Sequence, residues 1–144
     1  MRTFAKRIAT AVTLALALTG GAAAAGAVGD ANAAAGQWVW THLPNGDLGQ
    51  YIGVVRGQNA TWIHAEYHKT GGPPIVARFS YALLDSSRTN EYYVSPDTAW
   101  ERIDVLQTSR HDFTGVPFRG PHDCSIVFAE VEGQGTFSTP IVCG

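Results

Sequence analysis

Alternation with a period of two dominates this sequence after residue 36 and constrains the fold more than any other feature. Short runs of β-branched and aromatic residues recur between clusters of Gly, Pro, Asn and Asp, while the spacing of an amphipathic helix is nearly absent. Side chains of a β-strand alternate between its two faces, so such runs predict strands with one buried face. The pattern indicates an all-β fold of about seven antiparallel strands.

A two-sheet sandwich with the strand count of immunoglobulin-like or fibronectin-like domains is the expected architecture, and a small β-barrel is the alternative. Residues 61–69 form the clearest strand, with Ile63, Ala65 and Tyr67 predicted to face the core. Together with residues 75–84 they predict a hairpin around Gly-Gly-Pro-Pro. Ser95 and Pro96 predict a single helical turn, and no longer helix is expected.

The N-terminus has the three parts of a secretory signal peptide. Three basic residues precede an uncharged stretch rich in Ala, Leu and Val, and Ala31-Asn32-Ala33 provides small residues at the −3 and −1 positions of a cleavage site. We expect residues 1–33 to be a cleavable leader, with Ala35 as the next best cleavage point. A permanent membrane anchor is the alternative. Residues 34–144 are then expected to form one secreted, extracellular β-rich domain.

Charge argues against nucleic acid as a partner. The whole chain has 10 Lys and Arg against 12 Asp and Glu residues, and removal of the leader leaves 7 basic and 11 acidic groups, a net charge of −4. Nucleic-acid binding requires clustered Lys and Arg that neutralise phosphates. A polybasic stripe for a membrane surface is equally absent from the sequence. Contact with a membrane is therefore expected only during export through the signal peptide.

Cys124 and Cys143 are the two cysteines of the chain. Because export would place them in an oxidising compartment, a disulfide is expected between them, and a pair of free thiols is the alternative. In the chain-entropy model, closing a loop of this length stabilises a fold by about 3 kcal/mol.

His64, Glu66 and His68 alternate along the strand predicted for residues 61–69, so all three project from one face. Two imidazoles and a carboxylate suit zinc or a similar divalent ion. His111 or His122 could supply a further ligand. The competing interpretation is the solvent side of an amphipathic strand, with no cofactor.

Residues 109–123 are predicted to be a long irregular loop, because they include two prolines and two glycines. Loops of this length inside compact domains often have a function. Arg and aromatic side chains are common in protein interfaces, so this loop is a candidate for contact with a partner. Its candidate binding residues are Arg110, His111, Phe113, Arg119 and His122.

Tryptophan provides a second candidate surface. Trp38 and Trp40 alternate on the first predicted strand, and Trp62 follows on a later one. Exposed aromatic rings on a sheet can stack on sugar rings. For Trp62 and Trp100 the alternative interpretation, burial in the core of a sandwich, is favoured.

Motifs of catalysis are missing from the sequence. It contains no G-x-S-x-G, no H-E-x-x-H and no glycine-rich phosphate loop. We therefore expect a secreted, non-enzymatic binding protein. Its partner would be an extracellular protein, for example a hydrolase that it inhibits, or a polysaccharide. The alternative is a small extracellular metal-binding protein or metal-dependent hydrolase built on His64, Glu66 and His68.

Overall fold

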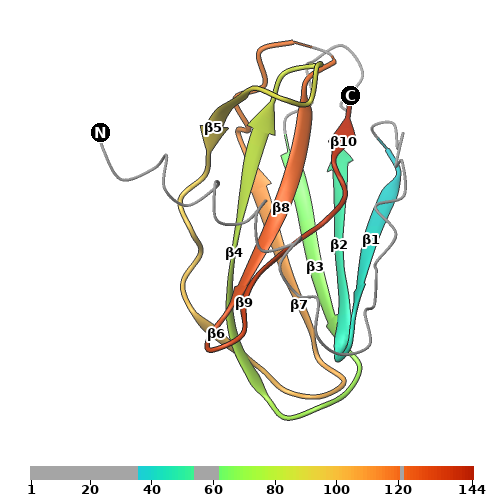
Figure 1. Ribbon diagram of the computed structural model, residues 1–144, viewed down its shortest axis with the longest axis vertical. Coiled ribbons are helices and arrows are strands. Elements are labelled where there is room, and N and C mark those ends of the chain that lie inside the picture. Colours follow the sequence, from blue (N-terminus) through green and yellow to red (C-terminus); the bar gives the residue numbers. More distant parts are fainter. Residues whose placement is uncertain (1–35, 54–61, 121) are drawn as a thin grey trace.

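The structure, a computed structural model, describes residues 36–53, 62–120 and 122–144, and the expected leader over residues 1–33 lies outside them. The described residues form ten strands in two antiparallel sheets and contain no helix (Figure 1). Accordingly, no helix in this part of the chain is long and apolar enough to cross a membrane. The two-sheet sandwich predicted from the sequence is confirmed, and the sheets do not close into a barrel.

The smaller sheet has four strands in the order β1-β2-β3-β7, with antiparallel pairing throughout. Its strands are β1 (Trp38–Leu43), β2 (Gly46–Gly53), β3 (Trp62–Lys69) and β7 (Thr108–Thr114). A short turn at Pro44 and Asn45 joins β1 to β2, as Pro-Asn-Gly-Asp predicts.

The larger sheet has six strands and follows the path β10-β8-β4-β5, with β6 also paired to β4 and β9 to β8. These strands are β4 (Ile75–Leu84), β5 (Glu91–Val94), β6 (Glu101–Ile103), β8 (Cys124–Val131), β9 (Gly135–Ser138) and β10 (Val142–Cys143). Cys124 and Cys143 are opposite each other on β8 and β10 and form the expected disulfide. The sequence also predicts a terminal hairpin of residues 124–132 and 136–143 around Gly133-Gln134-Gly135, and the antiparallel pairing of β8 with β9 confirms it.

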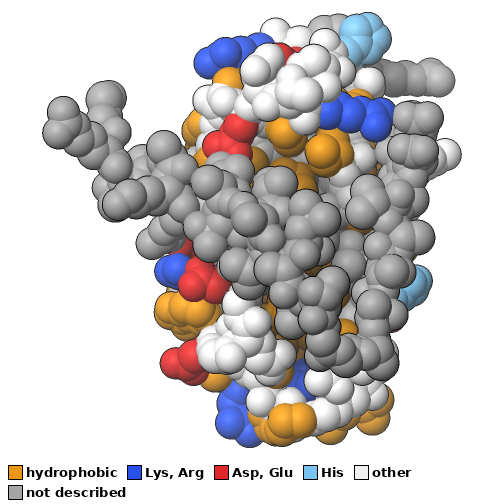
Figure 2. All heavy atoms as spheres, in the orientation of Figure 1, with side chains coloured by type: hydrophobic (Ala, Val, Ile, Leu, Met, Phe, Trp, Pro, Cys, Tyr) orange, Lys and Arg blue, Asp and Glu red, His pale blue; other side chains and the backbone are white. Residues whose placement is uncertain are grey.

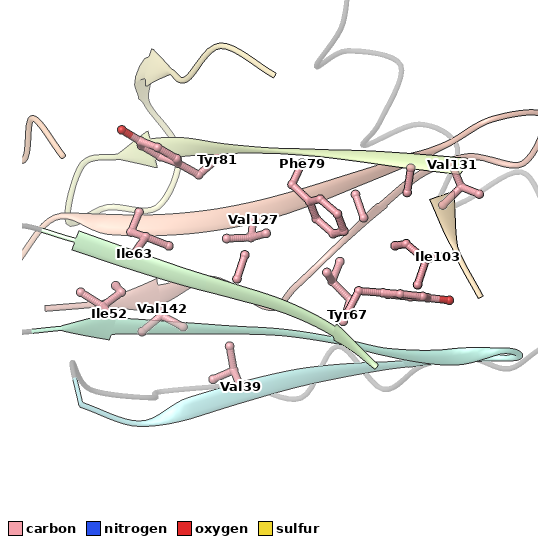
Figure 3. Close-up of a cluster of buried hydrophobic side chains, with 14 of the residues drawn as sticks. Val39, Ile52, Ile63, Tyr67, Phe79, Tyr81, Ile103, Val127, Val131 and Val142 are labelled. Atoms are coloured by element: carbon pink, nitrogen blue, oxygen red, sulfur yellow. The ribbon is translucent and has the colours of Figure 1, made fainter. Parts of the chain in front are cut away.

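The core fills the space between the two sheets (Figure 3). Ile63 and Tyr67 point from β3 toward the six-stranded sheet, as their alternation predicts, and Phe79 points back from β4. Ala65 and Tyr81 are buried with them, and the ring centroid of Tyr81 lies 5.0 Å from that of Phe113 on β7. These five side chains of β3 and β4 are at most 4% exposed. Fully burying one such large apolar side chain contributes roughly 1.5–3 kcal/mol, so these alternating positions hold the layers together.

Polar groups trapped between the layers are paired. Gln50 is fully buried, and its Nε2 donates to the carbonyl oxygens of Ser125 at 3.1 Å and Pro140 at 3.0 Å. The buried Lys69 donates from Nζ to the carbonyl of Gly71. No buried side-chain nitrogen or oxygen within the described ranges lacks a hydrogen-bond partner. Gln50 therefore ties the two sheets together as well as filling the core.

The hairpin predicted for residues 61–84 is wrong, because β3 and β4 belong to different sheets. The apolar faces of both strands must be buried, and in the structure they bury each other across the core instead of lying in one layer. Pro73 and Pro74 have no backbone N–H to donate to a strand ladder. The segment between β3 and β4 therefore leaves the four-stranded sheet and enters the six-stranded sheet.

The loop predicted for residues 109–123 is also partly wrong. The sequence predicts a strand over residues 102–108 before this loop. In the structure that stretch divides into β6 and a turn in which Leu106 has a φ of 64°, and β7 then extends to Thr114. On β7, alternate side chains point toward the core, namely those of Ser109, His111 and Phe113. Pairing with β3 therefore holds these residues in a strand although their sequence has no long apolar run.

No helical turn forms at Ser95 either. Its Oγ accepts the backbone N–H of Tyr81 at 2.9 Å, and Thr98 Oγ1 accepts that of Phe79 at 2.9 Å. The two hydroxyls belong to the extended segment between β5 and β6 and accept hydrogen bonds from backbone N–H groups of β4. The Ser95 hydroxyl is therefore already engaged and does not cap a helix.

Candidate functional site

The outer face of the four-stranded sheet, which points away from the six-stranded sheet, brings together aromatic, imidazole and charged side chains from all four of its strands. Because the strands pair in register, these side chains form rows across the sheet. One row runs Trp38, Tyr51, His64, Asp112, the next runs Trp40, Gly49, Glu66, Arg110, and a third runs His42, Asp47, His68, Thr108. Trp62 faces Gly53 beside the first row.

Four rings on this face form a continuous series, here named the aromatic row: Trp40, Trp38, Tyr51 and Trp62. Successive ring centroids are 5.1, 5.6 and 5.3 Å apart. The row therefore crosses β1, β2 and β3. Trp38 is the most accessible of the four, at 39% exposed, and the others are half-buried.

Two glycines of β2 make space for the indole rings. A Cβ at Gly49 would lie 2.5 Å from the ring of Trp40, its partner on β1, and a Cβ at Gly53 would collide with the ring of Trp62 on β3. Glycine in a strand often marks a close approach of this kind. In the sequence Gly49-Gln50-Tyr51-Ile52-Gly53, the tyrosine and the two glycines lie on the same face of the strand. This pattern was a signal in the sequence for the site.

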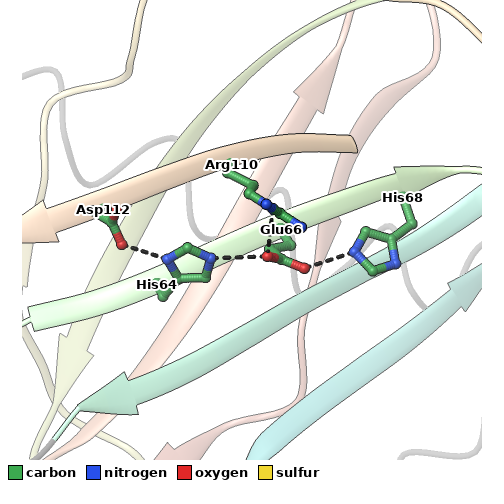
Figure 4. Close-up of polar contacts among 5 residues, drawn as sticks. All are labelled: His64, Glu66, His68, Arg110 and Asp112. Carbon is green, nitrogen blue, oxygen red and sulfur yellow. Dashed lines mark hydrogen bonds and ion pairs between the residues drawn. The ribbon is translucent and has the colours of Figure 1, made fainter. Parts of the chain in front are cut away.

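A second group lies beside the aromatic row, with His64 next to Trp38 and His68 next to Trp40. It consists of the five residues drawn in Figure 4 and is here named the polar chain. Glu66 is at its centre: Oε1 lies 3.1 Å from His64 Nε2 and 2.8 Å from Arg110 Nε, and Oε2 lies 2.6 Å from His68 Nε2. Asp112 accepts a hydrogen bond from His64 Nδ1 at the far end. Both nitrogens of His64 thus face a carboxylate, an arrangement that favours the doubly protonated imidazolium.

The pKa directions agree with this geometry. Burial by itself would lower the pKa of His64, but the hydrogen bonds and negative charges of Asp112 and Glu66 outweigh burial and raise it above 6.5. Burial would likewise raise the pKa of Glu66, but its bonds to His64 and His68 and the charge of Arg110 bring it below 4.5. The pairing within the polar chain therefore favours the charged forms of His64 and Glu66.

The predicted metal ligands do share one face, as their spacing requires. In the structure their donor atoms bond to one another and to Arg110. Residues 36–53, 62–120 and 122–144 contain no group of three His, Cys, Asp or Glu side chains arranged to hold a metal ion. His111, considered as a further ligand, lies on the opposite face, with its ring centroid 4.7 Å from that of Phe79.

The other candidate residues are dispersed. Phe113 faces the core against Tyr81, with ring centroids 5.0 Å apart. The guanidinium of Arg119 lies 4.2 Å above the ring of Tyr92, and His122 is exposed in the segment before β8. Of the five residues proposed for the loop, only Arg110 joins the outer face.

The prediction that Trp62 and Trp100 lie in the core is wrong. Trp62 lies half-buried in the aromatic row. Trp100 is 45% exposed between β5 and β6, with the guanidinium of Arg78 4.6 Å from its ring. Aliphatic side chains fill the core instead, together with Tyr67, Phe79 and Tyr81, and the sheets pack without an indole between them.

A Ser-His-Glu group also forms, at Ser109, His111 and Glu101. His111 Nε2 lies 3.1 Å from Ser109 Oγ and 2.6 Å from Glu101 Oε1, so one nitrogen faces both partners. A catalytic triad needs the serine and the carboxylate on opposite nitrogens of the imidazole. The hydrogen-bond geometry of this group is therefore that of a structural contact between β6 and β7.

A shallow, open depression on the outer face is lined by Trp38, Tyr51, Trp62, His64 and Asp112. Tyr51 and Asp112 were not singled out from the sequence, because their relation to His64 depends on strand pairing. Comparison of the chain with protein-family models, curated proteins and solved structures found no match.

Proposed function

We propose that this protein binds a polysaccharide on the outer face of its four-stranded sheet. The aromatic row is the observation that carries the proposal. Aromatic rings have a negative face and a positive edge, and the C–H groups of a sugar ring carry partial positive charge, so the two stack favourably. A row that crosses three strands offers contacts to several consecutive sugar units.

The polar chain adds the second requirement of sugar binding, which is a set of fixed hydrogen-bond donors and acceptors. Arg110 and Asp112 each have 65% of the side chain exposed beside the row. Both are held by partners in the sheet, through Glu66 and His64 respectively. Groups fixed in this way lose little entropy when they bond a hydroxyl.

A protein partner is less well supported than a polysaccharide. The proposal of a protein contact depended on residues 109–123 forming a loop, but His111 and Phe113 face the interior from β7. On the face of the molecule in Figure 2, basic and acidic side chains are interspersed among the described residues, without a basic stripe for a polyanion.

The proposal includes export of the protein from the cell, with residues 1–33 as the cleavable leader. The disulfide is compatible with an oxidising compartment. The intact mass of protein recovered from the culture medium tests this part, because it reports the cleavage site and the oxidised cysteines together. Recovery of the uncleaved chain in the cell would contradict it.

The binding test uses two tryptophans of similar exposure. Trp38→Ala removes part of the aromatic row, whereas Trp100→Ala removes an exposed indole elsewhere on the surface. Depletion of the purified protein by a panel of insoluble polysaccharides, followed by titration with soluble oligosaccharides, measures affinity. We expect Trp38→Ala to weaken binding about fivefold or more and Trp100→Ala to leave it unchanged. Equal effects of both changes, or no binding to any member of the panel, would overturn the proposal.

A further inference from the structure

We infer that the depression lined by Trp38, Tyr51, Trp62, His64 and Asp112 binds an ammonium group of the polysaccharide. The group would be either the protonated amine of an amino sugar or a quaternary ammonium substituent. This inference rests on the proposed function and specifies the class of sugar that the outer face selects.

The rings of the depression come from three strands. Trp38 on β1 and Trp62 on β3 flank Tyr51 on β2, with centroid distances of 5.6 and 5.3 Å. The imidazole of His64 is perpendicular to both indoles, at 89° and 90°. Several aromatic rings around one position are how proteins bind ammonium groups, because a cation is attracted to the negative ring faces.

A carboxylate at the rim supplies the matching charge. Asp112 lines the depression and has 65% of its side chain exposed. Apart from His64 itself, the nearest basic side chain by strand register is that of Arg110, which lies in the next row and pairs with Glu66 at 2.8 Å. The lining of the depression includes no Lys or Arg among the described residues.

His64 makes the site sensitive to pH. It is faced by Asp112 from β7, by Glu66 on its own strand, and by the rings of Trp38 and Trp62. A protonated His64 neutralises Asp112 and repels a bound cation. Because a positive charge on His64 opposes a second positive charge in the depression, loss of the His64 proton should strengthen the binding of an ammonium ligand that stays charged as pH rises.

The test compares charged and neutral ligands of equal shape. Choline is paired with its neutral isostere 3,3-dimethylbutan-1-ol, and glucosamine oligomers are paired with N-acetylated oligomers of the same length. Asp112→Asn removes the charge at the rim, and Asp104→Asn removes a similar surface charge that is paired with Arg102 elsewhere. Calorimetry and tryptophan fluorescence give the affinities of the purified protein and both variants.

We expect each charged ligand that binds to bind more tightly than its neutral partner. Asp112→Asn should weaken that ligand about threefold or more, with Asp104→Asn unchanged. Preference for the glucosamine oligomer identifies an amino sugar, and preference for choline identifies a quaternary group. For choline, whose quaternary group keeps its charge at every pH, His64→Gln should flatten the rise of affinity with pH, an effect that loss of structure alone would not produce.

The failures of the two proposals can be distinguished. Neutral oligomers that bind as tightly as charged ones, or tighter binding of a uronic-acid polymer, would overturn the ammonium site and leave polysaccharide binding in place. Choline binding that depends on Asp112, without binding to any polysaccharide, would support the site and overturn the proposed function. Absence of all binding would overturn both.

Discussion

The two faces of the four-stranded sheet are built from alternate residues of the same strands, yet they have opposite chemistry. On β3, Ile63 and Ala65 are fully buried against the other sheet, whereas His64 and Glu66 face outward with 17% and 11% of the side chain exposed. Holding charged groups in so little contact with water has a cost, and ion pairs of this kind are weak evidence for stability. The comparison teaches that the inner face accounts for folding and that the outer face needs another explanation, for which we propose ligand binding.

Replacement on the inner face should have the largest effect on stability. Ile63→Ala leaves a cavity between the sheets, and we expect it to lower the free energy of unfolding by about 2–5 kcal/mol, measured by chemical denaturation. Thr108→Ala, at an exposed position on the outer side of β7, should change it by less than about 0.5 kcal/mol. Similar losses in both variants would contradict the division between the faces.

Removal of the disulfide tests whether stability and binding are separable. Cys124 and Cys143 are 19 residues apart and lie in the other sheet, so the double change to Ser should lower the free energy of unfolding by about 3 kcal/mol. Ligand affinity of the folded variant should be unchanged. A loss of affinity under conditions in which the variant remains folded would show that the outer face depends on the far sheet.

Gly49→Ala perturbs the outer face without touching the core. The added Cβ would displace the ring of Trp40, so we expect an affinity loss of about threefold or more and a stability change within about 1 kcal/mol. Gly71→Ala is the matched control, because a Cβ there meets nothing within 4 Å. Unchanged affinity in Gly49→Ala would remove Trp40 from the site.

The smallest expected effect is the contribution of His64 to stability. Its pKa is raised by Asp112 and Glu66 in the folded state, so the contribution is fully present below the ordinary value of 6.5 and is lost as pH rises through the folded pKa. We expect less than about 1 kcal/mol, the usual scale for partly exposed ion pairs. Denaturation of the parent and His64→Gln proteins from acid to alkaline pH measures it. A difference that grows with rising pH would refute the role of the two carboxylates.

Local pattern was sufficient for much of the fold and for part of the site. The inward positions of Ile63, Tyr67 and Phe79 could be predicted because alternation is a property of a single strand. The common face of His64, Glu66 and His68 followed from the same rule. The disulfide followed from the number of cysteines and the expected compartment.

Tyr51 and Asp112 could not be found in this way, because each meets His64 only through pairing with another strand. His64 and Asp112 are 48 residues apart. The position of Trp62 was predicted wrongly for a related reason: whether an indole is buried or lies over Gly53 depends on which strand is adjacent.

By itself, therefore, the sequence determined the strand period, the class of fold, the cysteine pair and the row of acidic and imidazole groups on one strand. Only the tertiary structure decided that β3 lies between β2 and β7 and that β4 belongs to the other sheet. The physical reason is that strand pairing is selected by the packing of all apolar faces at once. That packing brought three aromatic rings and a carboxylate from four strands around one depression.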